Sequence, residues 1–151
     1  FCTLLPLFSK TTMEAFLTKI VTEKNFAMGI SWEPQGDVLV SAGTPFYLAD
    51  AKMQAYKAKS EEFKFPKGKG IPGRVWESKG YEGKDSVQNF TAEQYPRVNV
   101  AKECGVKGCC AFAVLKGGEV AYVAEFFLFG DYAEDAAVVQ YIKDEAAKVF
   151  A

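Results

Sequence analysis

The stretch from residue 68 to residue 80 constrains the fold more than any other part of the chain, because glycine and proline there prepare the backbone for a short apolar helix. Pro72 has a preset φ and lacks the amide proton that the first turn of a helix leaves unpaired. Gly70 and Gly73 permit backbone angles or close approaches that a side chain would block. The pattern therefore predicts a helix that begins near Ile71 and ends before Gly80.

The same glycines also have the G-x-G-x-x-G spacing of a dinucleotide-binding loop, with Gly68 in the first position. That motif requires an apolar strand leading into the loop, within a strand-helix-strand unit. Residues 63–67 contain Pro66, which cannot donate a hydrogen bond in a central strand. The Gly-Lys-Ser/Thr triplet of a phosphate-binding loop is absent as well. These surroundings argue against a nucleotide site, and we expect no cofactor.

Length and charge point to one domain with few classes of partner. A chain of 151 residues can bury a substantial core, and 49% hydrophobic with 25% charged residues is typical of a globular protein. A net charge of -1 gives no attraction toward nucleic acid or anionic membranes. No apolar run approaches the roughly 20 residues that cross a bilayer. We expect an N-terminal extension (1–10), a single domain (11–151), no nucleic-acid partner and no membrane span.

Histidine is absent from the chain, which limits its chemistry. Zinc sites and acid-base arrangements that need histidine cannot form, and none of the four cysteines belongs to a C-x-x-C pair. Cys109 and Cys110 lie in an apolar run, where a strand would point them to opposite faces. We interpret them as buried thiols in a reducing compartment, cytoplasm or an organelle such as a plastid; a redox-sensing thiol is the alternative. We predict no catalytic residue and no metal ligand.

Hydrophobic periodicity predicts helices at both ends of the chain and strands between them. A capping-box spacing places the start of the first helix at Thr12. Glycine-containing turns at Gly36 and Gly117 predict two hairpins. The terminal helices each have one apolar stripe, so we expect both on the same face of the sheet. The predicted helices are 12–23, 51–63, 91–103 and 132–150, and the predicted strands are 26–32, 38–40, 106–115 and 119–129.

The segment Gly70-Ile71-Pro72-Gly73-Arg74-Val75-Trp76 resembles the signature of GAF domains, and the resemblance extends over nearly the whole chain. It implies an α+β fold, GAF-like and PAS-related, in which a central antiparallel sheet carries helices on both faces. It also implies that Gly70, Pro72 and Gly73 form a structural loop beside a ligand cavity, and that Asp85 opens the next strand.

A narrower resemblance concerns residues 53–60, 70–76, 95–97 and 106–109. These segments are similar to the GAF-like amino-terminal region of plant and algal NIN-like proteins, transcription factors that respond to nitrate. Ala113 departs from the pattern, because the family often has proline there. The resemblance implies a regulatory domain of plant or algal type, with a nitrate-type anion among its candidate ligands.

Arginines and aromatic residues are the candidates for ligand binding. Planar guanidinium groups suit the bidentate binding of an anion, and rings suit an apolar lining, although rings more commonly fill a core. Glu125 lies inside an apolar strand, where an unpaired charge would be costly, so we expect it to pair with Arg74 or Arg97; a perturbed acid-base group is the alternative. The candidate ligand-binding residues are Arg74, Trp76, Tyr95, Arg97, Phe112 and Phe126.

These observations favour a non-enzymatic docking or regulatory module, an accessory or scaffold subunit that contacts other protein subunits in a larger assembly. The near-neutral charge and the 15% aromatic content fit such a protein. A sensory domain for a small organic ligand or a nitrate-type anion is the alternative, and a thiol-based redox sensor or reductase is a third hypothesis. Docking through the terminal helices predicts partial exposure of Phe8, Phe16 and Ile20, or of neighbours near Tyr141 and Val149.

Overall fold

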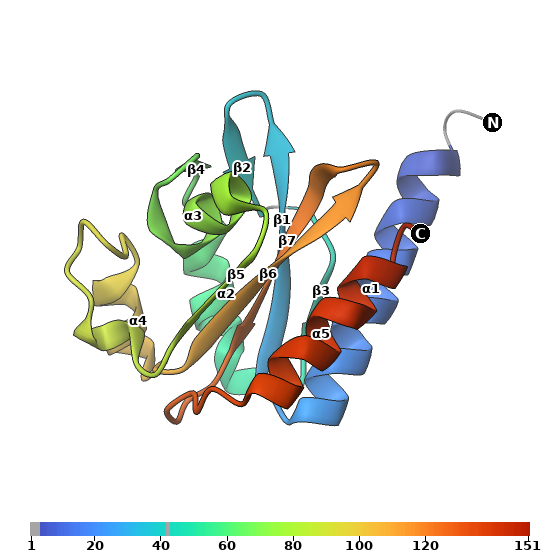
Figure 1. Cartoon of the computed structure of the whole chain (residues 1–151). Coiled ribbons are helices and arrows are strands. Elements are labelled where there is room, and N and C mark those ends of the chain that lie inside the picture. Colours follow the sequence, from blue (N-terminus) through green and yellow to red (C-terminus); the bar gives the residue numbers. More distant parts are fainter. Residues whose placement is uncertain (1–3, 42) are drawn as a thin grey trace.

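A curled antiparallel sheet lies between two layers of helices (Figure 1). The structure is a computed structural model that describes residues 4–41 and 43–151, with side chains described from residue 10 onward. In chain order the elements are α1 (Leu4–Lys24), β1 (Met28–Gln35), β2 (Val38–Val40), β3 (Phe46–Leu48), η1 (Ala51–Met53), α2 (Gln54–Ser60), β4 (Phe65–Pro66), α3 (Gly70–Ser78), β5 (Tyr81–Lys84), η2 (Val87–Asn89), α4 (Val98–Cys104), β6 (Cys109–Lys116), β7 (Glu119–Phe127) and α5 (Ala136–Lys148).

The strands follow the order β4-β2-β1-β7-β6-β5, and β3 pairs with the other end of β1. Both predicted hairpins are present, β1–β2 and β6–β7. The second one turns at Gly117 and Gly118, whose φ values of +61° and +83° belong to a conformation that glycine adopts readily. Strand alternation places Cys109 and Cys110 in different core clusters on opposite faces of the sheet, as predicted.

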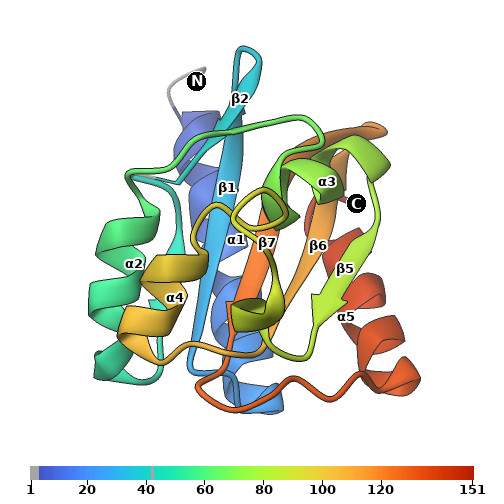
Figure 2. The ribbon, with the colours of Figure 1, turned by 90° about the vertical axis from the view of Figure 1, so that its left-hand side faces the viewer.

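The two terminal helices, α1 and α5, pack side by side on one face of the sheet (Figure 1). Figure 2 shows α2, α3 and α4 on the other face. The α+β architecture and the common face of the terminal helices are therefore confirmed. Among the described residues, no helix is both long and apolar enough to cross a membrane.

The expected exposure of the terminal helices is only partly observed. Phe16 and Ile20 are buried against the sheet, so the prediction that they stay exposed is wrong. They belong to the apolar stripe that covers the sheet, which is the face a helix buries first. Tyr141 and Val149 are half-buried, and the side chain of Phe8 lies outside the described residues.

Several predicted boundaries also differ from the structure. The first helix begins at Leu4 instead of Thr12, because Pro6 falls in its first turn, where a missing amide proton is tolerated. The segment 91–103 is helical only from Val98, since Pro96 disfavours helical angles in the residue before it. The division into an extension (1–10) and a domain (11–151) stays a prediction, and α1 runs continuously across it.

Two strand predictions need correction as well. Asp85 follows β5 instead of opening it, because the strand already pairs with β6 from Tyr81 to Lys84. Strand β3 was not predicted, and it is held by pairing with β1.

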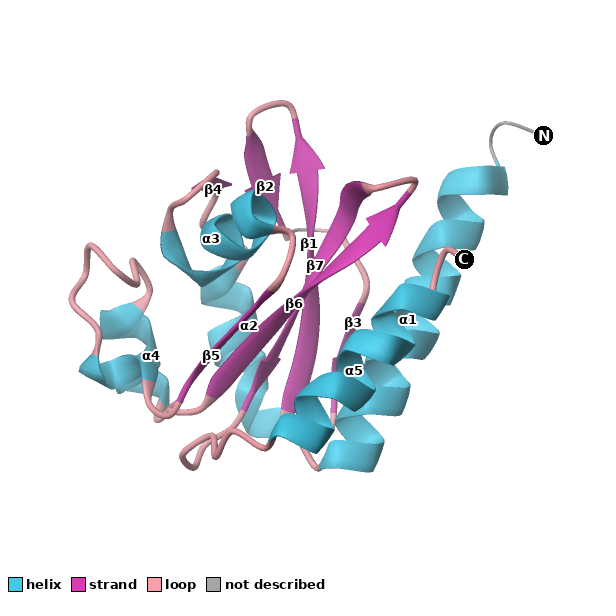
Figure 3. Ribbon diagram, viewed as in Figure 1, coloured by secondary structure: helices cyan, strands magenta, loops and turns pink. Residues whose placement is uncertain are grey.

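The glycine loop has the predicted structure, with α3 beginning at Gly70, one residue from the expected start (Figure 3). Gly70 has a φ of +67°, and a Cβ there would lie 2.8 Å from the ring of Phe65. At Gly73 a Cβ would lie 2.3 Å from the carbonyl oxygen of Pro66. The two glycines therefore bring α3 against the backbone of β4.

We predict that Gly73→Ala destabilises the fold by about 1–3 kcal/mol, because the new methyl group meets a backbone atom that cannot rotate away. Chemical denaturation measures the effect. Gly130→Ala is the matched control, since a Cβ at Gly130 meets no atom within 4 Å. Equal unfolding free energies for the two variants would contradict this account of the loop.

A second prediction concerns Glu145 on α5, which accepts hydrogen bonds from Lys148 and from Lys19 of α1. These contacts lower the pKa of Glu145 from 4.5 to about 2, so its stabilisation is complete above pH 4.5 and is lost as the pH falls through about 2. Glu145→Gln should therefore lower the thermal midpoint at neutral pH, and the difference from wild type should vanish near pH 2. Glu93→Gln, at an exposed carboxylate, is the control. A difference independent of pH would contradict the assignment.

Candidate functional site

A fully buried ion pair between Arg97 and Glu125 occupies the layer between the sheet and helices α2 to α4. The guanidinium donates from Nη1 to Oε1 at 3.0 Å and from Nη2 to Oε2 at 2.8 Å. Glu125 projects from the central strand β7, and Arg97 belongs to the turn before α4. The pair thus joins the middle of the sheet to the chain segment that covers it.

The carboxylate of Glu125 has further donors from neighbouring strands. Trp32 on β1 donates from Nε1 to Oε1 at 2.8 Å, and the Cys109 thiol on β6 donates to Oε2 at 3.4 Å. Both carboxylate oxygens are therefore bonded twice. A buried carboxylate needs such a full set of hydrogen bonds to offset the free-energy cost of removing its charge from water.

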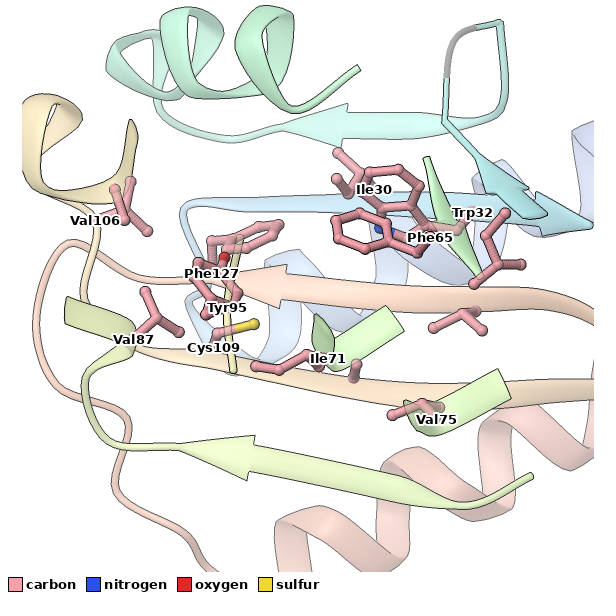
Figure 4. Close-up of a cluster of buried hydrophobic side chains, with 14 of the residues drawn as sticks. Ile30, Trp32, Phe65, Ile71, Val75, Val87, Tyr95, Val106, Cys109 and Phe127 are labelled. Atoms are coloured by element: carbon pink, nitrogen blue, oxygen red, sulfur yellow. The ribbon is translucent and has the colours of Figure 1, made fainter. Parts of the chain in front are cut away.

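Aromatic rings surround the guanidinium of Arg97. The centroids of Tyr95 and Phe65 lie 4.7 Å and 5.0 Å from its Cζ, and that of Trp32 lies at 5.3 Å. Phe127 and Tyr56 are slightly farther, at 5.8 Å and 6.0 Å. Figure 4 shows Trp32 and Phe65 together, with Tyr95 and Phe127 close by in the same cluster. Rings that face a desolvated cation add a favourable cation-π attraction.

The electrostatics of the cluster keep Arg97 charged and the Cys109 thiol protonated at neutral pH. Burial alone lowers the pKa of Arg97, but the Glu125 carboxylate outweighs it, and the pKa lies well above its usual range. Burial, reinforced by Glu125, raises the pKa of Cys109. Burial also raises the pKa of Cys110 on the opposite face. Both thiols therefore stay protonated, in the form that is neither a nucleophile nor a good redox sensor.

Hydrogen bonds leave one nitrogen of the Arg97 guanidinium without a partner. The Nε–H of Arg97 has no acceptor among the described residues. The hydroxyl groups of Tyr56 and Tyr95 bond to each other beside it. The guanidinium therefore binds Glu125 through its two terminal nitrogens, while its Nε–H stays unpaired within the ring of aromatic side chains.

Arg74, the other candidate arginine, is also bound to an internal carboxylate. Its Nε and Nη2 donate to Glu82 on β5 at 2.9 Å and 2.8 Å, and its Nη1 donates to the carbonyl of Gln94 at 2.7 Å. The side chains of Arg74 and Glu82 are 30% and 26% exposed. This pair fastens α3 to the edge strand and to the turn that leads to Arg97.

The candidate ligand-binding residues do not gather around one cavity. Trp76 and Tyr95 belong to the same cluster as the rings around Arg97, whereas Phe112 and Phe126 belong to the cluster under the terminal helices. The reason is strand alternation, because Phe126 follows Glu125 and must point to the other face. The structure thus separates the six residues into two layers.

Sequence reasoning missed most of the cluster. Its unrecognised members are Trp32, Tyr56, Phe65, Cys109 and Phe127. One signal was available, because Trp32 and Glu125 both lie in apolar strands and each carries a polar group that needs a partner. Joining them required the register of β1 on β7, which pairs Ile30 with Glu125.

With this geometry established, comparison with known proteins identifies the family. Residues 17–144 match the family model described as the NLP protein GAF domain. The chain belongs to this family. Among curated proteins it is similar to Protein NLP1 of Arabidopsis thaliana, with 29% identity over 114 residues and 68% of the chain covered. It is also similar to Protein NLP3 of Oryza sativa subsp. japonica, with 28% identity over 96 residues and 62% of the chain covered.

The NLP GAF chain spans only a small part of these relatives, 12% of NLP1 and 10% of NLP3.

Solved structures share its fold. The GAF domain region of a putative membrane protein from Geobacter sulfurreducens has a TM-score of 0.72 and 11% identity, covering 95% of this chain and 91% of its own. A type II free methionine-R-sulfoxide reductase from Thermoplasma acidophilum has a TM-score of 0.68 and 10% identity, with coverages of 94% and 89%. At these identities the likeness shows the fold alone.

We predict that Glu125→Gln destabilises this domain by about 3–5 kcal/mol, because it leaves the Arg97 guanidinium buried without a counter-charge. The matched control is Glu82→Gln, which breaks the half-exposed pair with Arg74 and should cost about 0–1 kcal/mol. Urea denaturation measures both. Equal losses would contradict the importance given to the buried pair.

A related prediction uses chemical rescue. Glu125→Ala removes the carboxylate and leaves the donors of Arg97 and Trp32 facing a space of carboxylate size. Formate or acetate should then raise the melting temperature of the variant in a saturable way, as a ligand of the folded state does. The wild type should show no such rise. Equal responses of the two proteins would show that the anions act elsewhere.

Proposed function

We propose that this NLP GAF domain is a non-enzymatic regulatory module that docks other protein subunits, as an accessory or scaffold part of a larger assembly. One observation carries the proposal: the layer where a small ligand would be expected is filled by the Arg97–Glu125 pair and its rings. Arg74 is bound to Glu82 in the same manner. Both candidate arginines are thus occupied by internal carboxylates, which supports a role carried by the surface of the domain.

The chemistry of the buried groups supports a role without catalysis. Cys109 and Cys110 are buried on opposite faces of the sheet, and burial raises the pKa of each thiol. A thiol-based redox sensor or reductase needs an accessible cysteine of low pKa, which neither of these two thiols provides. Of the cysteines that the structure describes, only Cys104 is partly exposed. The likeness to reductases of known structure rests on 10–15% identity and carries no activity to this chain.

A sensory domain for a nitrate-type anion is the second candidate, and one observation favours it. The fork of Arg97, the Trp32 indole and the surrounding rings together form a recognition set for a planar oxyanion. Binding would require the anion to displace Glu125 from that set. The two candidates therefore differ in whether Glu125 stays bound to Arg97.

Native mass spectrometry of the protein purified gently from its source tests the docking function. The expected result is recovery in defined complexes with other protein subunits, without a retained small molecule. A ligand that binds only the folded state raises the melting temperature of a protein. If the domain docks proteins and has no small ligand, a panel of nitrate, nucleotides and organic acids should leave its melting temperature unchanged. Recovery solely as a free monomer with a stoichiometric small molecule would overturn docking in favour of sensing.

A further inference from the structure

The free part of β6 is an unusual edge of the sheet. Strand β5 pairs with Cys109 to Phe112 only, whereas β6 continues to Lys116. The amide of Ala113 donates to the carbonyl of Gly80 at 2.9 Å, so Ala113 directs its backbone toward the β5 side. The β-bulge beside Val114 and Leu115 has its extra residue, Ala121, on β7, so β6 keeps its alternation and Leu115 turns its N–H and C=O to that side too. Among the described residues, no strand lies beside it there.

A groove of about 360 Å³ lies along this edge, between β6 and α5. Leu115 in its wall is 37% exposed, which is unusual for the large apolar side chains of this domain. The tip of the β6–β7 hairpin lies above the C-terminal end of α5 in Figure 1. The residues that line the groove are Lys79, Gly80, Phe112, Ala113, Leu115, Lys143, Ala146 and Ala147.

The charge of this edge groove is positive. Among the described residues, those with a charge that line it are Lys79 and Lys143. Lys143 lies 5.7 Å from the centroid of the Tyr81 ring, and no ion pair is formed by it within the described structure. Lys79 donates to the carbonyl of Gly118 at 3.0 Å and lies 3.6 Å from Glu119. Such an exposed pair is weak, so the lysine is able to exchange this partner for another.

We propose that the edge groove binds an extended, acidic segment of a partner protein, which adds as a strand beside Leu115. An unpaired strand edge supplies the backbone hydrogen bonds, as in other cases of strand addition. Alternation puts the side chain of Leu115 on the face opposite Phe112 and Ala146, so the apolar side chains of the segment pack on Leu115. Its carboxylates lie on the face toward α5, where they approach Lys143, with Lys79 beside the edge. This inference rests on the proposed docking function and names the surface and the partner chemistry.

The experiment titrates the domain with a short fluorescent peptide in which glutamate and valine alternate. Anisotropy should show saturable binding, and amide NMR shifts should concentrate at Ala113 to Lys116. A peptide with lysine in place of glutamate should bind at least about tenfold more weakly, because it meets like charges. The double substitution Lys79→Gln/Lys143→Gln, at exposed positions, should weaken the acidic peptide by several-fold while leaving the melting temperature unchanged.

Backbone methylation of the peptide separates strand addition from charge attraction alone. Methyl groups on the valine amides and methyl groups on the glutamate amides lie on opposite edges of the added strand. One methylated peptide should retain affinity and the other should lose about tenfold or more, because it loses hydrogen bonds to β6. Equal affinities would overturn the proposal.

Other outcomes also decide the matter. Absence of peptide binding overturns the proposal. Lys79 would then be a residue that prevents other strands from pairing with this edge, as lysines on edge strands commonly do. Shifts confined to α1 and α5, or self-association through Leu115, would overturn it as well. If native complexes survive the double lysine substitution, docking stands but uses another surface. If the domain is recovered only as a monomer with a small molecule, the docking function itself fails.

Discussion

The buried pair of Arg97 and Glu125 is the interaction on which the rest of the interior depends. Removing two charges from water costs several kcal/mol for each, and only close attraction with full hydrogen bonding offsets that cost. Here the carboxylate receives donors from the turn before α4, from β1 and from β6. Any segment that moves leaves a charge unsatisfied. The pair therefore fixes the position of the covering turn on the sheet, and Arg74 with Glu82 repeats this device at the edge.

The same constraint shapes what the NLP GAF domain is suited to do. A guanidinium inside an aromatic enclosure is a good receptor for a planar anion, but its fork is used by a carboxylate of the same chain. The terminal helices cover the other face of the sheet with a separate apolar cluster. The proposed docking function uses the exterior, where the free edge of β6 and the two lysines of the groove present backbone groups and positive charge.

Local chemistry made much of the fold predictable from sequence. Pro72 and the flanking glycines placed the start of α3 within one residue, and the glycine turn at Gly117 located the β6–β7 hairpin. The apolar stripes of α1 and α5 predicted their common face. Where the effect of a proline on a helix start was misjudged, at Pro6 and Pro96, the boundaries differed by several residues.

The candidate site was much less predictable, because its members come together only through strand register and long-range packing. Trp32 meets Glu125 across the β1–β7 pairing, and Tyr56 comes from α2, far along the chain. A list of aromatic residues cannot tell which face each one occupies. Phe126, next to Glu125, shows the consequence, since alternation places it on the far side of the sheet.

The most direct test of the account is a crystal structure of the unmodified domain grown in concentrated sodium nitrate. The account predicts that both oxygens of Glu125 remain bound by the fork of Arg97, with the Trp32 indole still donating to the same carboxylate. An oxyanion bound between Arg97 and Trp32, with Glu125 turned away from both, would contradict it and establish the interior as a ligand site.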